Sequence, residues 1–251
     1  MDNRVRACVA ELVGTFAFVL VAAGTACVVQ LPALNGNPTF GLIAVALAQG
    51  CALAVALTVT LNVSGGFLNP AVTLMLWVFK RMDGVKTAGL IAAQIIGALL
   101  AGAILRLIGG DNVTWMAASR LGTPHLNPEI FHAPPYSLWV LAGGIGVEMV
   151  LAFLYTFAIF GTILDRRAPR LGGLGAGLAQ AAIVLVGFHI TGGAANPAMW
   201  VGTVAWEYTV VALKETAFAD HPVFWMGPIL GALLAGGLYI KLILPEEKDE
   251  G

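Results

Sequence analysis

The chain has 251 residues, of which 59% are hydrophobic and only 11% are charged. Soluble domains carry roughly 45–50% apolar and about 25% charged residues, so this composition excludes an ordinary soluble protein. The formal net charge of -1 gives no sign of a nucleic-acid partner. Three cysteines lie in or beside apolar runs, and their spacing predicts neither a disulfide framework nor a metal site (Cys8, Cys27 and Cys51). The composition indicates a polytopic membrane protein.

Six apolar stretches each approach the ~20 residues that an α-helix needs to cross ~30 Å of hydrocarbon. In chain order they cover approximately residues 7–30, 40–61, 87–108, 137–163, 174–190 and 222–244. The first is too long for the apolar region of a signal peptide, and we expect it to be a membrane helix. Two further apolar segments, about 69–79 and 196–206, are too short to cross. We expect each to be a re-entrant half-helix or a surface segment.

The basic residues predict the orientation. With six spans, ten of them fall on the side of the N-terminus and three on the other side. The ten are Arg4, Arg6, Lys80, Arg81, Lys86, Arg166, Arg167, Arg170, Lys241 and Lys248, and the three are Arg106, Arg120 and Lys214. By the positive-inside rule, both termini are then cytoplasmic and the loop 109–136 is extracytoplasmic.

The chain contains an internal repeat. The sequence Gly-Ala-Leu-Leu-Ala-Gly occurs at Gly97–Gly102 and again at Gly231–Gly236, and its small residues are typical of close helix packing. Glu11 in the first span has a counterpart in Glu148 in the fourth. Because each half holds three spans, the second half must start from the opposite side of the membrane. We therefore expect one domain, 1–251, made of inverted repeats at about 7–108 and 137–244, with its functional site near the midplane.

The same repeat brings two Asn-Pro-Ala triplets, which open the two short segments. They are Asn69-Pro70-Ala71 and Asn196-Pro197-Ala198. Proline is favoured at the first helical position and asparagine is a good N-cap, so each triplet predicts the start of a half-helix inside the membrane. If each asparagine oxygen caps its own helix, its side-chain N–H groups are free to point into a pore. The alternative is an ordinary turn, as expected for the third Asn-Pro pair at Asn127-Pro128.

The residues Ser64–Val72 and Thr191–Ala198, with Ala10–Thr15 and Phe224–Pro228, resemble the aquaporin and aquaglyceroporin family, the major intrinsic proteins. The resemblance covers nearly the whole chain. It implies an all-α membrane fold with six tilted helices and two half-helices that meet at the centre. It further implies a homotetramer in a plasma membrane, with one pore per subunit for water or small uncharged solutes. No enzyme activity and no cofactor are expected.

The resemblance also assigns roles to residues. The six triplet residues are expected at the narrow centre, where two helix dipoles converge and exclude protons and ions. Glu11 and Glu148 are expected to hold the re-entrant loops, although a proton relay is the competing explanation. The pore-lining residues of those loops are expected to be Gly65, Gly66, Phe67, Gly192, Ala194 and Ala195.

The selectivity filter departs from the family pattern. Relatives carry an arginine directly after the second triplet, and this chain has Met199 there. Gly193, Val184 and Gln49 stand at the other three filter positions. This filter is uncharged, so glycerol, urea and metalloid hydroxides are candidate solutes beside water. A secondary transporter built on an inverted repeat is the alternative function. His189, near the outer end of the fifth span, is either a protonation gate or a histidine bonded to loop backbone.

Overall fold

The computed structural model describes residues 2–31, 37–132 and 137–244; Lys248 and the rest of the charged tail lie outside this range. The regular elements of the described chain are all helical. In order they are α1 (Asn3–Val28), α2 (Pro38–Thr60), α3 (Pro70–Val78), α4 (Gly84–Gly109), α5 (Val113–Ser119), η1 (Arg120–Gly122), α6 (Leu138–Ile159), η2 (Phe160–Leu164), α7 (Leu174–Gly187), α8 (Pro197–Glu207), η3 (Val211–Leu213), α9 (His221–Leu238) and η4 (Tyr239–Ile243).

Five segments in the described ranges are long and apolar enough to cross a membrane: Asn3–Val28, Thr39–Thr60, Gly84–Gly109, Leu138–Leu164 and His221–Ile243. They match five of the six expected spans. The fifth expected span, 174–190, is shorter in the structure, because α7 has 14 residues and ends at Gly187. The backbone N–H groups of Thr191 and Gly192 turn back onto the carbonyl oxygen of Gly187, at 2.9 and 3.1 Å, and this turn ends the helix.

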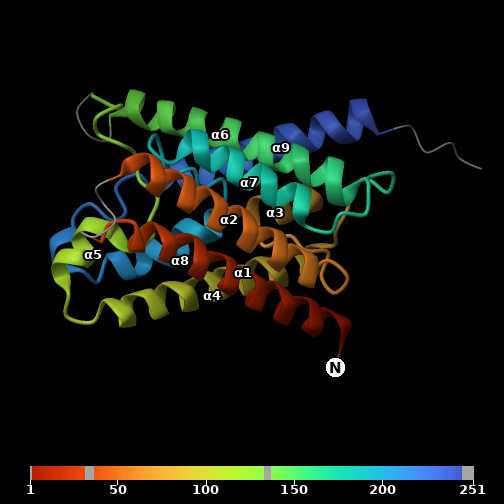
Figure 1. Cartoon of the computed structure of the whole chain (residues 1–251). Helices are drawn as coiled ribbons and strands as arrows, with labels where there is room; N and C mark the ends of the chain where they lie inside the picture. The colour runs from red at the N-terminus through yellow and green to blue at the C-terminus, as the bar shows by residue number, and fades with distance from the viewer. Residues whose placement is uncertain (1, 32–36, 133–136, 245–251) are drawn as a thin grey trace, which may run out of the picture.

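The two halves of the chain pack in corresponding ways. Helix α1 packs along α4, α6 packs along α9 in the same manner, and α2 packs against α7 across the middle. The short helices exchange partners in part, since α3 of the first half packs against α9 as well as α4, and α8 of the second half packs mainly against α4. In Figure 1, α3 lies toward the end of the bundle that carries the N-terminus, and α8 lies toward the opposite end. The exchange interlocks the two halves.

The repeated Gly-Ala-Leu-Leu-Ala-Gly sequence permits the closest of these contacts. A Cβ atom on Gly97 of α4 would overlap the carbonyl oxygen of Leu12 in α1. At the equivalent place, a Cβ atom on Gly231 of α9 would overlap the carbonyl oxygen of Met149 in α6. The expectation that these small residues serve close helix packing is confirmed.

The lateral surface of the bundle is apolar. Large aliphatic side chains on the long helices are exposed, among them Val13, Val55, Leu100, Leu154 and Leu234. In water, an apolar surface of this extent would be unfavourable, whereas in a bilayer it contacts lipid tails. Polar side chains such as Glu11, Gln94 and Glu148 are instead buried inside the bundle.

Candidate functional site

The two short helices begin at the two triplets. Asn69 is the N-cap of α3, and its Oδ1 accepts a hydrogen bond from the backbone N–H of Ala71 at 2.9 Å. Asn196 caps α8 in the same way, with its Oδ1 at 3.0 Å from the N atom of Ala198. Pro70 and Pro197 occupy the first helical positions, where a missing N–H is harmless. The predicted capping of both half-helices is confirmed.

The two asparagines also join the helix starts to each other. The Nδ2 atom of Asn69 donates to the carbonyl oxygen of Ala195 at 2.9 Å. Reciprocally, Nδ2 of Asn196 donates to the carbonyl oxygen of Leu68 at 2.9 Å. The expectation that both side-chain N–H groups stay free is therefore wrong for one N–H of each amide. A primary amide has two N–H groups, so one remains on each asparagine.

The loops that precede the triplets have matching backbone conformations. Leu68 and Ala195, each directly before its asparagine, adopt left-handed φ angles of 50° and 46°. Such angles are unusual for residues with a side chain and persist only where the surroundings hold them. In each loop two consecutive glycines with positive φ come first: Gly65, Gly66, Gly192 and Gly193. The glycines are the residues that can adopt these turns without strain.

Glu148 of α6 holds the second of these loops. Its side chain is fully buried. One carboxylate oxygen accepts from the Thr191 hydroxyl at 2.5 Å and from the backbone N–H of Ala194 at 3.2 Å. The other accepts from the backbone N–H of Ala195 at 2.7 Å. Three donors thus satisfy a carboxylate that would otherwise be costly to bury.

Glu11 of α1 does the same for the first loop and is equally buried. It accepts from the Ser64 hydroxyl at 2.6 Å and from the backbone N–H groups of Phe67 and Leu68 at 2.9 and 2.7 Å. A fourth donor is Nε2 of Gln94, at 2.6 Å, which also lies 2.9 Å from the Thr73 hydroxyl. Sequence reasoning missed Gln94, although an amide in the middle of an apolar span is itself a functional signal.

Two of the four candidate filter residues meet at one cavity. A cavity of about 330 Å³ opens at the end of the bundle near α5, and its lining includes Gln49 and Met199. Both side chains are almost completely buried. The Gln49 Oε1 accepts from Nε2 of Gln180 at 3.2 Å, while its own Nε2 has no partner among the described residues. A donor is therefore available beside the cavity.

The other two candidate filter residues are not in the lining of this cavity. Val184 of α7 packs in a small cluster with Val45 and Ala46 of α2. Gly193 has a φ of 62°, and a Cβ atom there would lie 3.3 Å from the backbone of Gly187. Its neighbour Gly192 does line the cavity. The structure thus brings Gln49 and Met199 together at one cavity. Val184 and Gly193 do not line this cavity.

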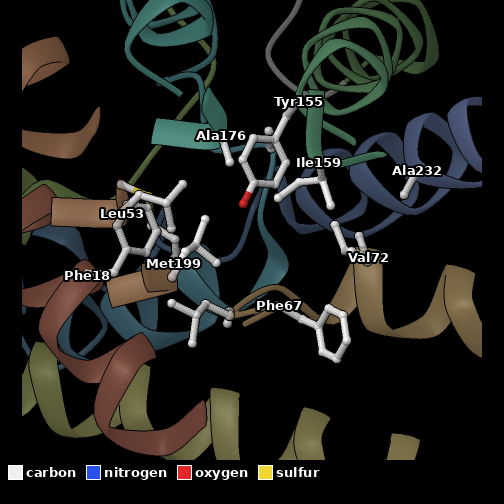
Figure 2. Close-up of a cluster of buried hydrophobic side chains, with 14 of the residues drawn as sticks. Phe18, Leu53, Phe67, Val72, Tyr155, Ile159, Ala176, Met199 and Ala232 are labelled. Atoms are coloured by element: carbon white, nitrogen blue, oxygen red, sulfur yellow. The ribbon is translucent and has the colours of Figure 1, made fainter. Parts of the chain in front are cut away.

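Met199 belongs to a buried cluster that also contains Phe18 and Leu53 (Figure 2). Tyr155 of α6 is part of the same cluster, and Figure 2 shows its hydroxyl pointing toward the interior of the group. Sequence reasoning did not select Tyr155, because a tyrosine in an apolar span gives no sign of which face it occupies. Trp200 lies elsewhere, stacked on Phe224 with ring centroids 5.6 Å apart.

The remaining sequence candidates have simpler surroundings. Cys51 is exposed and lines an apolar groove between α1 and α2. The ring of His189 lies edge-on to Phe188 and lines the cavity shared by Gln49 and Met199 (the outer cavity). Asn127 donates from its side chain to the carbonyl oxygen of His189 at 2.8 Å, which ties the loop that follows η1 to the end of α7. The third Asn-Pro pair is therefore a loop contact and opens no half-helix.

Two capped half-helices meeting inside an apolar bundle define a membrane channel protein, and comparison with known proteins agrees. The family model of the major intrinsic proteins matches residues 2–239. Aquaporin TIP4-4 from Zea mays is 36% identical over 250 residues, which cover 98% of this chain and 90% of that protein. Aquaporin TIP4-1 from the same plant is 33% identical, with 98% of this chain and 89% of that protein covered.

The fold is likewise shared with a solved structure. The X-ray structure of the aquaglyceroporin from Plasmodium falciparum matches with a TM-score of 0.81 and 22% sequence identity. The match covers 96% of this chain and 98% of that chain. The chain therefore belongs to the major intrinsic protein family. It is an integral membrane protein of the aquaporin fold, a passive channel and not an enzyme.

Proposed function

We propose that this channel conducts water and small uncharged solutes larger than water, with glycerol, urea and metalloid hydroxides as the candidate solutes. The observation that carries the proposal is the pair of reciprocal hydrogen bonds between Asn69 and Ala195 and between Asn196 and Leu68. They join two helix N-termini at the centre of the bundle. A solute that passes there meets two positive dipole ends and one remaining N–H on each asparagine.

The proposal that larger solutes pass rests on Met199 and Gly193. An arginine would supply a fixed charge and a fork of N–H donors, whereas methionine is flexible, apolar and uncharged. The Nε2 atom of Gln49, which has no partner in the described part of the chain, offers the outer cavity a hydrogen-bond donor that suits a hydroxyl or carbonyl oxygen. Together with Val184 these residues form the proposed filter, which is wide and weakly polar.

Cation exclusion then rests mainly on the triplets. The converging dipoles of α3 and α8 raise the energy of a cation at the midplane, and opposed dipoles reverse the orientation of water on its way through. The pore-lining role of Phe67 and Ala194 and the loop-holding role of Glu11 and Glu148 belong to the same proposal. The buried hydrogen bonds of both carboxylates support it.

We further propose a homotetramer in the plasma membrane with both termini cytoplasmic. The ten-to-three distribution of basic residues supports the orientation. The single domain 1–251 with inverted repeats at about 7–108 and 137–244 is supported by the corresponding packing of α1 on α4 and of α6 on α9.

Stopped-flow measurements on proteoliposomes test the function. Vesicles that contain the purified protein should have a higher permeability to water, glycerol and urea than empty vesicles. This difference in the rate of swelling or shrinking should not require an ion gradient. A channel that passes water and excludes glycerol and urea would contradict the wide filter. Accumulation of a solute against its gradient, coupled to an ion, would instead support the secondary transporter.

A further inference from the structure

A loop whose backbone is strained at its start lines the outer cavity. Arg120, Leu121 and Gly122 have consecutive left-handed φ angles of 47°, 52° and 71°. Two of these residues carry side chains, and such conformations persist only where other contacts hold them. The loop continues past Pro124 to His125, and both residues line the cavity that Gln49 and Met199 share.

His125 supplies one of the contacts that hold this loop, beside the bonds of Leu126 to Asp220 and of Asn127 to His189. Its Nε2 lies 2.7 Å from a carboxylate oxygen of Glu207, at the end of α8. Its Nδ1 lies 3.1 Å from a carboxylate oxygen of Asp220, the N-cap of α9. The imidazole is 11% exposed and Glu207 is fully buried. Of the four histidines in the chain, this one bridges two carboxylates; the rings of His132, His189 and His221 belong to exposed residues.

The geometry determines the protonation state. Ionised carboxylates can only accept hydrogen bonds, so both ring nitrogens of His125 must carry a proton to satisfy both partners. Burial by itself lowers the pKa of His125, but the hydrogen bonds and charges of Asp220 and Glu207 outweigh burial and raise that pKa above its usual value. The two carboxylate partners and the raised pKa therefore both favour the imidazolium form.

Other charged groups around the imidazole balance its charge. Arg120 donates to the second oxygen of Glu207 from Nε at 2.8 Å and from Nη2 at 2.6 Å. The backbone N–H of Leu126 donates to Asp220 at 2.9 Å. Two cations thus face two carboxylates, one on α8 and one at the start of α9. When His125 loses its proton, one carboxylate faces a nitrogen lone pair and the group acquires a net negative charge.

We propose that the His125 imidazolium is a latch that positions the outer loop over the mouth of the channel, so that the solute-size limit depends on it. His125 is a positioning residue, since it acts on solutes through the loop. Pro124 packs directly against the backbone of Gly192, where an added Cβ atom would lie 2.6 Å from the Pro124 Cα. Release of the latch lets this contact separate and widens access to Met199. This proposal rests on the channel function proposed above.

The sign of the pH effect follows from the raised pKa. The latch is complete below the ordinary histidine pKa of about 6.5 and is lost as the external pH rises through the raised value. In proteoliposomes, the ratio of glycerol to water permeability should therefore rise several-fold toward alkaline external pH. A charge change alone, without loop release, would leave this ratio of neutral solutes unchanged.

Variants separate a latch from a structural role. The glutamine side chain of His125→Gln is neutral at all pH values. The ratio of glycerol to water permeability of this variant should therefore be high and independent of pH. Asp220→Asn removes one cause of the raised pKa of His125. The midpoint of the pH-dependent permeability ratio should therefore shift to lower pH, an effect that destabilisation alone would not produce. His221→Gln is the matched control, because His221 is an exposed histidine one residue from Asp220. It should keep the parent midpoint of the pH dependence.

Hydrogen–deuterium exchange gives a readout that does not depend on permeation. The amides of residues 120–128 should lose protection across the same pH range as the permeability change, after correction for intrinsic exchange rates. Unchanged protection in the parent, or a pH step that persists in His125→Gln, would overturn the latch. If the protein shows the pH-dependent change in hydrogen exchange but conducts no solute, the latch is supported and the proposed channel function is contradicted.

Discussion

At the residue scale, we expect Met199 to set the size of the solutes that the proposed filter admits. Met199→Arg places a charged fork beside Gln49 at the outer cavity. We expect glycerol and urea permeability to fall more than water permeability, because the longer, charged side chain narrows the opening. Stopped-flow light scattering with each solute measures the change.

Met199→Ala is the companion variant. If the methionine leaves the filter open, its removal should change the selectivity little. Should the parent exclude glycerol and urea while Met199→Ala admits them, the methionine would be a plug and the wide filter would be wrong.

Glu148 carries the stability of the second re-entrant loop. Glu148→Gln keeps one acceptor but turns an NH₂ group toward donors from Thr191, Ala194 and Ala195. Each donor left unpaired in a buried site costs about 1–3 kcal/mol. We expect a clear fall in the thermal unfolding midpoint in detergent, whereas Glu215→Gln, at an exposed residue, should have no effect. An unchanged thermal unfolding midpoint in Glu148→Gln would show that this carboxylate does not stabilise the loop.

Sequence alone predicted the residues whose chemistry is local. The N-cap geometry of Asn69 and Asn196 follows from the triplets themselves, since capping involves a backbone N–H two residues on. The bond from Asn69 to Ala195 escaped prediction because it joins residues 126 positions apart. His125 and Glu207 escaped for the same reason, since neither lies in a motif and only the fold brings them together.

At the scale of the helices, we propose that the two half-helix starts form the barrier to cations. Asn69→Asp replaces the amide that donates to Ala195 with a carboxylate, which repels that carbonyl oxygen and adds negative charge where two dipoles converge. We expect cation conductance to rise, as measured by voltage clamp of oocytes, and the same for Asn196→Asp. Asn112→Asp, at the exposed N-cap of α5, is the control. If both variants fold and their cation conductance stays as low as that of the parent, the barrier to cations does not lie at the starts of α3 and α8.

The turn after α7 is where mercury should act. Gly193→Cys introduces a thiol beside Gly192, which lines the outer cavity, and should create a mercurial block that the parent lacks. The left-handed φ of 62° at this position should cost the variant roughly 1–2 kcal/mol in stability. Cys51 faces the groove between α1 and α2, so the parent should be insensitive. A block of the parent that Cys51→Ala relieves would mean that α2 is rotated.

Helix existence was easier to predict than helix length. Apolar runs indicated the five long segments because hydrocarbon thickness sets their minimum length. The end of α7 was placed three residues too late, since Phe188, His189 and Ile190 are compatible with a helix on composition. The turn of Thr191 and Gly192 onto Gly187, a local backbone choice, ends it there.

At the scale of the whole molecule, the proposed homotetramer needs an apolar face between subunits. A groove of about 600 Å³ between α1 and α2, lined by small and β-branched residues, is the face that we expect it to use. Val55→Trp in this groove should shift the protein from tetramer to monomer in native mass spectrometry. Leu107→Trp, on the exposed surface of α4, should leave the tetramer intact. Tetramers that persist in Val55→Trp would place the subunit contact elsewhere.

The exchange of half-helices between the two halves has a consequence for biosynthesis. When the first half leaves the ribosome, the Asn69 amide and the Leu68 carbonyl lack their partners, which lie in a segment of chain that has not yet been made. Helix α3 likewise awaits α9, the last of the long helices. The nascent chain must therefore insert α3 before these partners of the half-helix exist. We expect the centre of the channel to form only after the last helix has been synthesised.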